Sequence, residues 1–574
     1  MECVDGDYQT FKSKDGAYVR EHFFNTPELK AMVANWTDDD IWRLNRGGHD
    51  PHKVFAAYQA AVNHSGQPTV ILAKTIKGYG MGESGEAQNI THQQKKMGTI
   101  SLKAFRDRFK LPIADGDLEA LPYLKFDDNS AVLKYMRDQR LKLGGYLPAR
   151  RRAVPPLPVP PLSAFEAQLK ATGEGREVST TMAFVRILNT LMRDKVLGAR
   201  IVPIVPDESR TFGMEGMFRQ FGIWNQQGQA YVPQDADQLM FYKESKDGQI
   251  LQEGINEAGA MADWIAAATA YSTHGVQMIP FYVFYSMFGL QRTMDLCWAA
   301  GDSRARGFLV GGTAGRTTLN GEGLQHEDGH SHVLAATIPN CVSYDPTFAY
   351  EVAVIVQDGL RRMVAEQEDV FYYLTVMNEN YEHPAMPAGV EADILKGMYL
   401  FRRAPAANSP RVQLLGSGVI FREAIAAAEL LKKDWGVDAD LWSCPSFTEL
   451  ARDGHECSRH RLLRPEAPPR ECHVTRCLAD TRGPVIAATD YIRLFAEQIR
   501  PFIAGRSYTV LGTDGFGRSD TREKLRHFFE VDRYWITVAA LRALAEEGQI
   551  DLSKVAAALA KYGLDAAKPN PAKV

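Results

Sequence analysis

The sequence predicts an α/β protein built on parallel sheets, and three observations support this fold class. From residue 179 onward, apolar runs of strand length alternate with amphipathic helical segments, which is the pattern of strands joined by helical crossovers. A proline-rich run, RRRAVPPLPVPPL at residues 150–162, precedes that region. A loop rich in glycine, charge and histidine, residues 311–332, follows an apolar strand-like segment. Ligands of open α/β sheets bind at such strand exits, so this loop is the first candidate for a functional site.

Length and composition place the chain among multidomain globular proteins. At 574 residues it is too long for a single core, and about two to four domains are expected. The formal net charge of −4 gives no reason to expect a nucleic acid or an anionic membrane as a partner. The apolar stretches are shorter than the ~20 residues that span a bilayer, and no signal peptide is expected. Seven cysteines without a disulfide framework predict reduced thiols and a cytoplasmic location.

Before the proline-rich run, residues 68–73 are predicted to form a buried strand. They lead into a glycine-rich loop with Gly78, Gly80, Gly82 and Gly85, and such a loop can fold over a ligand. The proline-rich run forbids helix and central strand and favours a semi-rigid extended linker. For its three leading arginines, residues 150–152, we expect a solvated linker end rather than a phosphate or localisation patch.

After the linker, Ser179 is predicted to cap a helix that continues to Met192. The segments expected as strands here are 201–205, 276–284, 307–310 and 370–376, and those expected as helices are 261–271 and 348–365. A third unit is predicted from about residue 403, with strands at 412–415, 437–442, 485–488 and 509–511. Its helices are expected at 421–433, ending at Gly436, at 490–499 and at 534–564, with a frayed tail over 566–574.

Chemistry-bearing side chains gather in residues 250–332. Glu257 stands at a helix start in ILQEGINEAGA, and the aromatic run IPFYVFYSMFG carries Tyr285 and Phe288 at its end. The loop that follows contains three histidines in seven residues, His326, His330 and His332. A carboxylate, an aromatic platform and imidazoles at strand ends predict proton transfer on a flat heterocycle. Three close histidines also suggest zinc, although the neighbouring acids fit a hydrogen-bond network as well.

These stretches resemble the pyrimidine-binding domain of thiamine diphosphate enzymes of the transketolase superfamily. They are most similar to the homodimeric first components of bacterial pyruvate dehydrogenase complexes. Further segments that resemble this family lie at residues 4–24, 46–54, 75–97, 206–216, 446–454 and 511–532, so the resemblance covers essentially the whole chain. It implies an α/β, three-domain transketolase-like thiamine diphosphate-binding fold with the first domain incomplete. The implied divisions are residues 1–155 for the end of a diphosphate-binding domain, 156–163 for the linker, 164–400 for the pyrimidine-binding domain and 401–574 for the carboxyl-terminal domain.

The resemblance also implies an activity and a set of partners. Such an enzyme decarboxylates pyruvate with thiamine diphosphate and Mg²⁺. It then reductively acetylates the lipoyl domain of the dihydrolipoamide acetyltransferase, and it works as a homodimer. Glu257 matches the carboxyl group that hydrogen-bonds N1′ of the aminopyrimidine and so promotes removal of the C2 proton, and Phe288 matches the aromatic that stacks on that ring.

Six further positions match the family in or near its active centre. Tyr285 is expected near the substrate carboxylate or the covalent adduct, and His326 matches an active-site histidine. Lys77 and His92 stand at the two ends of the glycine-rich loop. They are expected to face the active centre when the loop closes. There Lys77 would bind the substrate's carboxylate or the developing anion, and His92 would orient or protonate the dithiolane of the lipoyl group. Asp207 and Glu208 match acids near the dimer interface, where a structural ion pair is equally open.

The sequence departs from the family in one respect. The family binds Mg²⁺ through a Gly-Asp-Gly motif and a later asparagine, and Asp5-Gly6-Asp7 matches a different family position. The Mg²⁺ ligands are therefore expected upstream of Met1, and the 574 residues alone are expected to be inactive. A transketolase-type transferase and a non-catalytic truncated remnant remain the alternative functions.

Overall fold

The computed structural model describes residues 3–44, 47–146, 150–206, 209–234, 236, 242–405, 408–503 and 505–574. The chain divides into two compact units, one up to Gly145 and one from Tyr146 to Val574. In the described residues no helix is long and apolar enough to cross a membrane.

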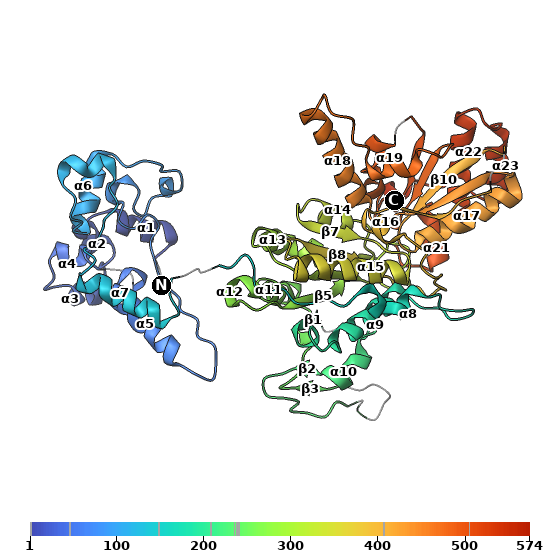
Figure 1. The fold of residues 1–574 in the computed structure, drawn as a ribbon. Coiled ribbons are helices and arrows are strands. Elements are labelled where there is room, and N and C mark those ends of the chain that lie inside the picture. Colours follow the sequence, from blue (N-terminus) through green and yellow to red (C-terminus); the bar gives the residue numbers. More distant parts are fainter. Residues whose placement is uncertain are drawn as a thin grey trace. The chain divides into compact units, whose positions relative to one another are not determined.

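The regular elements of the first unit are all helices in its described residues, and loops join them (Figure 1). Its α-helices are α1 (Asp5–Ser13), α2 (Gly16–His22), α3 (Pro27–Met32), α4 (Asp38–Trp42), α5 (Pro51–Asn63), α6 (Thr99–Arg108) and α7 (Ala131–Lys142). The strand predicted at 68–73 is wrong, because this segment is extended but unpaired, with Val70 81% and Leu72 91% exposed. A strand needs a hydrogen-bonded neighbour, and none of the described residues of this unit provides one.

The glycine-rich loop of the first unit folds around a buried carboxylate. Glu86 Oε2 accepts hydrogen bonds from the backbone N–H groups of Gly80 and Gly82, both at 3.2 Å. The guanidinium of Arg108 pairs with the same carboxylate, whose side chain is only 4% exposed. Gly80 has φ +92°, and a Cβ there would press on the ring of Phe109 at 2.7 Å. The loop is thus held by an acid of its own sequence.

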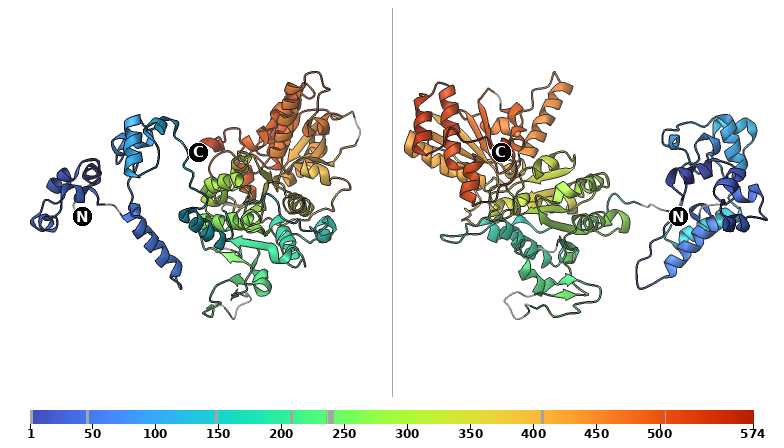
Figure 2. Two further views of the ribbon diagram at one scale, coloured as in Figure 1. Left: turned by 60° about the vertical axis from the view of Figure 1, so that its left-hand side comes forward. Right: turned by 180° about the vertical axis from the view of Figure 1, so that it is seen from behind.

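The second unit contains two sheets (Figures 1 and 2). The larger has six strands in the order β4-β1-β5-β6-β8-β7, and all its neighbours are parallel. Its strands are β1 (Ile201–Val205), β4 (Leu251–Gln252), β5 (Ile279–Tyr285), β6 (Phe308–Gly312), β7 (Cys341–Tyr344) and β8 (Phe371–Thr375). Between β1 and β4 in the sequence, the strands β2 (Ile223–Trp224) and β3 (Glu244–Ser245) form a separate short parallel pair.

Helices cover both faces of the six-stranded sheet. The side chains of β5 alternate, so that Phe281 and Val283 pack in one core cluster while Tyr282 and Phe284 pack in the other. The helices that line the two faces are α9 (Thr180–Met192) and α15 (Ala349–Leu360) on one side, and α11 (Glu257–Ala268), α13 (Gly289–Asp302) and α14 (Ser331–Ala336) on the other. The predicted Ser179 cap of α9 is confirmed, since its side chain accepts from Met182 N at 3.1 Å.

The smaller sheet has five strands in the order β13-β12-β10-β11-β9, with only β9 antiparallel. Its strands are β9 (Tyr399–Arg402), β10 (Arg411–Gly416), β11 (Asp438–Ser443), β12 (Val485–Ala488) and β13 (Tyr508–Leu511). The helices that follow or cover it are α17 (Ile420–Trp435), α18 (Phe447–Leu463), α19 (His473–Leu478), α20 (Leu494–Glu497), α21 (Arg522–Phe528), α22 (Arg533–Glu546) and α23 (Ser553–Lys561). Gly436 ends α17 in the left-handed conformation, as predicted.

Two predictions for the end of the chain are wrong. The helix expected over 490–499 shortens to α20, because the buried Asp490 carboxylate accepts from Thr317 N at 2.8 Å and Tyr491 O accepts from Thr513 N at 2.9 Å. These bonds hold the start of the segment in a non-helical form. The tail expected to fray is instead docked, with Pro571 buried and Lys568 Nζ donating to Phe528 O at 2.6 Å.

The proline-rich linker is extended, as predicted, and it lies on the second unit. Arg151 N donates to Ser272 O at 3.1 Å, and its Nη1 donates to Thr273 O at 3.2 Å. Gln367 forms a reciprocal pair with the backbone of Val154, at 2.9 and 2.7 Å. The arginine run is therefore exposed but anchored, which corrects the expectation of a purely solvated end. The predicted domain boundaries themselves stay predictions.

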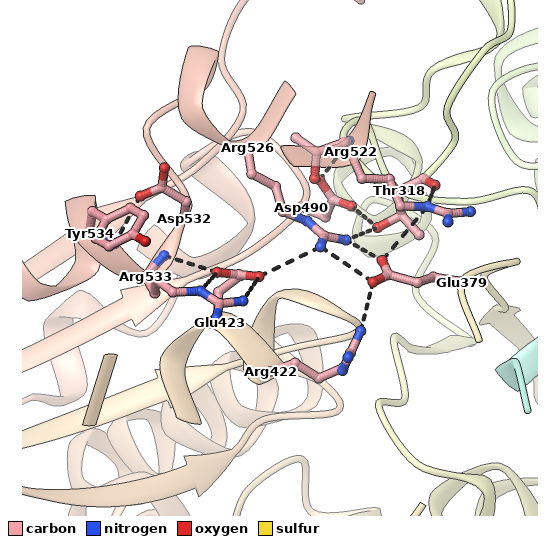
Figure 3. A network of polar contacts seen from close by, with 11 residues as sticks. Thr318, Glu379, Arg422, Glu423, Asp490, Arg522, Arg526, Asp532, Arg533 and Tyr534 are labelled. Atoms are coloured by element: carbon pink, nitrogen blue, oxygen red, sulfur yellow. Dashed lines mark hydrogen bonds and ion pairs between the residues drawn. The ribbon is translucent and has the colours of Figure 1, made fainter. Parts of the chain in front are cut away.

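The two sheets meet at a network of arginines and acids (Figure 3). Arg526, with a side chain only 7% exposed, pairs with Glu379 from the segment after β8 and lies 3.6 Å from Glu423 of α17. Arg422 Nη1 donates to the same Glu379 at 2.6 Å, and Arg533 binds Glu423 through Nε at 2.8 Å. Burial opposes ionisation of Glu379, but its hydrogen bond to Arg526 and the arginine charges outweigh burial and lower its pKa.

Gly483, just before β12, should be intolerant of any side chain. Its φ is +84°, and a Cβ would overlap the carbonyl oxygen of Arg411. Gly483→Ala is expected to lower the thermal midpoint of the second unit strongly, because β10 and β12 must separate. Gly436→Ala is the matched control. That glycine also has a positive φ, +66°, but open space around it, so only the left-handed strain of about 1–2 kcal/mol is expected. Equal losses in the two variants would contradict the clash.

Candidate functional site

Parallel pairing brings the predicted site residues to one edge of the six-stranded sheet. The last residue of β5, Tyr285, is in register with Gly312, the last residue of β6. The chain then turns into α13 after β5 and into the loop of residues 313–330 after β6. Because all these strands are parallel, their carboxyl ends share one edge, and both loops leave from it side by side.

Three rings form the centre of this edge. The His326 imidazole lies 5.1 Å from the ring centroid of Phe288 and 5.5 Å from that of Tyr285. Tyr285 and Phe288 are 6.0 Å apart, and Phe212 backs Tyr285 edge-on at 5.4 Å. The sequence predicted that Tyr285, Phe288 and His326 would converge, and the structure places them in contact. Phe212 was not predicted, since it lies in a separate loop after β1.

Glu257 starts α11, as its sequence context predicted. Asn256 caps the helix by accepting from Gly259 N at 3.1 Å, so the carboxylate of Glu257 stands in the first turn. Its Oε1 accepts from Arg292 Nη1 at 2.6 Å. The same guanidinium lies over the Phe288 ring at 4.2 Å and so links the carboxylate to the aromatic platform. The sequence prediction missed Arg292, whose signal was its spacing four residues after Phe288 at the start of a helix.

The three histidines of the loop diverge. His326 faces the aromatic rings, and its Nδ1 lies 3.2 Å from Gly323 O. His330 Nε2 lies 2.9 Å from Gln291 Oε1. His332 is fully buried, with Nε2 2.8 Å from Thr375 Oγ1, and burial lowers its pKa to about 3. His332 therefore stays neutral, and the described residues contain no cluster of three metal-ligand side chains.

The remaining predicted residues lie elsewhere. Lys77 and His92 belong to the first unit, at the two ends of the loop around Glu86, and both side chains are exposed. Their approach to the active centre stays a prediction. Asp207 and Glu208 lie outside the described residues.

The geometry fits the aminopyrimidine part of thiamine diphosphate. The Arg292 guanidinium contacts both the Glu257 carboxylate and the Phe288 ring. The Arg292 side chain is 47% exposed, whereas that of Glu257 is 12% exposed. An exposed arginine can swing into water, which would leave Glu257 and Phe288 free for a flat polar ring. Among the described residues of this unit, no group of three His, Cys, Asp or Glu side chains is placed to hold a metal ion such as Mg²⁺.

Two family models match the second unit. Residues 159–384 match the pyruvate dehydrogenase E1 component middle domain, and residues 397–532 match the transketolase-like C-terminal domain. The first match spans the six-stranded sheet with Glu257, Phe288 and His326, and the second spans most of the five-stranded sheet and its connections.

Curated relatives match along nearly the whole chain. Pyruvate dehydrogenase E1 components of Cupriavidus necator, Pseudomonas aeruginosa and Escherichia coli are 74%, 62% and 57% identical over 100%, 99% and 99% of this chain. The chain spans 64% of the length of each of these relatives.

Among solved structures, transketolase from Campylobacter jejuni has a TM-score of 0.59 at 16% identity and covers 94% of this chain and 75% of its own. Transketolase from Leishmania mexicana has a TM-score of 0.58 at 16% identity, with 87% and 65% covered. These likenesses confirm the predicted transketolase-like α/β fold.

The ion pair of Glu257 should contribute much less to stability than the buried network at the sheet junction. Arg292→Ala is expected to cost under about 1 kcal/mol, because the exposed guanidinium is screened by water. Arg526→Ala is the matched comparison and should cost about 3–5 kcal/mol, because it removes the buried cation between Glu379 and Glu423 and with it the main partner of Glu379. Thermal denaturation of both variants measures the difference. A loss from Arg292→Ala as large as that from Arg526→Ala would show that Arg292 is a structural residue and not a displaceable cover.

Proposed function

We propose a function from the premise that this chain belongs to the pyruvate dehydrogenase E1 family. The proposed reaction is decarboxylation of pyruvate with thiamine diphosphate, followed by reductive acetylation of the lipoyl group of the acetyltransferase component. What carries the proposal is the convergence of Glu257, Phe288 and His326 at one sheet edge, in a chain with relatives of that family along nearly its whole length. The chain spans 64% of the length of those relatives, so the proposed activity is assigned to the full-length polypeptide. This term means the longest natural polypeptide that contains these 574 residues.

In the proposed site each residue has one task. Glu257 is placed to hydrogen-bond a ring nitrogen of the cofactor, and a helix start helps to hold its charge. Phe288 offers a flat apolar face, and Tyr285 closes the other side of the platform. His326 is within reach of both rings and can hold or release a proton at its free nitrogen. The cofactor, when bound, supplies the electron sink for decarboxylation, and Mg²⁺ would hold its diphosphate.

The proposal extends to a second copy of the chain. Lys77 and His92 lie on a glycine-rich loop of the first unit, and we propose that this loop completes the active centre of the partner in a homodimer. His92 would then protonate the dithiolane and Lys77 would bind the pyruvate carboxylate. A cytoplasmic location remains part of this proposal. A transferase of transketolase type is the less favoured candidate, because the transketolase structures share the fold at only 16% identity.

Glu257→Ala tests the first half of the reaction. Removing the carboxylate should lower pyruvate-dependent turnover of the full-length polypeptide by several orders of magnitude, on the order of 10³-fold or more, because cofactor activation precedes every later step. Exchange of the cofactor's C2 hydrogen for deuterium reports the same step directly. Glu257→Asp, which keeps the charge on a shorter arm, is the control. Near-normal C2 exchange in Glu257→Ala would refute the role.

His92→Ala separates the two halves. Decarboxylation measured with an artificial electron acceptor should be kept, while reductive acetylation of the lipoyl domain should fall by about 10²–10⁴-fold, the usual contribution of a general acid. Both assays are run on one preparation of the full-length polypeptide. His52→Ala, on helix α5 of the same unit, serves as the matched control. Equal loss in both assays would show that His92 serves the pyruvate step or the fold instead.

A further inference from the structure

The segment after β13, residues 512–522, has no task in the proposed reaction, yet it is bound to the loop that carries His326. Ser519 Oγ donates to Glu322 O at 2.5 Å, and Arg522 Nε donates to Thr318 O at 2.7 Å. In the other direction, Arg316 Nη1 donates to Thr513 O at 2.6 Å. The five-stranded sheet thus fixes the His326 loop through backbone groups, at three places along the loop.

The attachment nearest to His326 in the sequence is made by Glu327. Its carboxylate is buried, with the residue 1% exposed, and its Oε2 accepts from Arg518 N at 2.6 Å. The other oxygen, Oε1, is buried and has no hydrogen-bond partner in the described part of the chain. Gly517 allows the approach, because a Cβ there would overlap Leu324 O and press on the Glu327 side chain at 3.0 Å. Burial of a carboxyl group with one oxygen unpaired lowers the stability of the fold. This position therefore indicates a role other than stability.

That role follows from the neighbouring residue. His326 is held on one side by the turn at Gly323, whose carbonyl accepts from His326 N at 2.9 Å. On its other side the next residue, Glu327, attaches the loop to Arg518 through its side chain. The imidazole lies 5.1 and 5.5 Å from two rings, and its Nδ1 lies 3.2 Å from Gly323 O of its own loop. Its place over the rings therefore depends on where that loop is held.

We propose that Glu327 is a positioning residue for the His326 imidazole, which it holds over Tyr285 and Phe288 by anchoring the loop on the backbone N–H of Arg518. The proposal rests on the proposed function, since it assigns His326 a place in that reaction. It also gives the 512–522 segment a task, because the segment supplies the anchor point from the other sheet.

The ionisation of this buried carboxyl should affect the loop. Burial, together with the Asp490 carboxylate, raises the pKa of Glu327 to about 8, although the Arg518 N–H and the charge of Arg316 favour the ionised form. The folded-state pKa lies above the ordinary value, so the proton is held at neutral pH and lost as pH rises through 8. Ionisation would place a charge with an unpaired Oε1 in a dry site, which loosens the loop.

Three variants of the full-length polypeptide test this inference. Glu327→Ala should lower kcat/KM for pyruvate by about 10- to 100-fold, the cost of a misplaced group. Glu327→Gln keeps the acceptor for Arg518 N–H and should restore most of the activity at pH 7. It should also remove the decline above pH 8 that we expect of the unmodified polypeptide, because an amide does not ionise. Glu466→Ala, an exposed glutamate of the same unit, should leave both activity and pH profile unchanged.

Two further measurements distinguish positioning from general damage. In a His326→Ala background, Glu327→Ala should have less than about a 3-fold effect, because its partner is gone. Hydrogen exchange at the amide of Arg518 and over residues 323–327 should quicken by about tenfold in Glu327→Ala and stay unchanged in Glu327→Gln.

The outcomes separate this inference from the proposed function. An undiminished effect of Glu327→Ala without His326, or unchanged exchange in Glu327→Ala, overturns the inference. If the unmodified polypeptide does not turn over pyruvate, the proposed function fails, and the exchange measurement still decides whether Glu327 anchors the loop.

Discussion

The parallel register between β5 and β6 is the constraint on which the candidate site depends. Because Tyr285 and Gly312 are paired, the two following loops must leave the sheet as neighbours. Phe288 lies at the start of the helix after one strand, and His326 lies in the loop after the other. Neither loop would bring its side chains to the other without that pairing. A shift of one residue would turn Tyr285 into the opposite face of the sheet.

Electrostatics differ between the site and the junction of the two sheets. At the junction, the buried Arg526 bridges Glu379 and Glu423, and the more exposed Arg422 and Arg533 pair with the same two acids (Figure 3). At the site, the pair of Glu257 and Arg292 is partly exposed and easily exchanged for a ligand. The contrast suits the proposed function, in which the sheets must stay fixed while one carboxylate must change partners.

Glu327 connects these two regions. Its Oε2 accepts from the segment that follows β13, its Oε1 has no hydrogen-bond partner among the described residues, and its neighbours include the buried Asp490 and Arg316. Gly517 permits the contact because it has no side chain. The second sheet is therefore more than a neighbouring domain, since it fixes the backbone from which a candidate catalytic histidine projects.

The sequence by itself determined the α/β class and the resemblance to the family, because periodicity and motifs are local properties of the chain. Through that resemblance it predicted Glu257, Tyr285, Phe288 and His326 as candidate site residues. Only the tertiary structure decided the roles of Arg292 and Glu327, since each depends on a partner remote in sequence. The same reason explains the errors. Residues 68–73 have strand composition but no strand beside them, and the helix expected from residue 490 is interrupted because Asp490 binds Thr317. Hydrogen-bond partners distant in the chain outweighed local preference in each case.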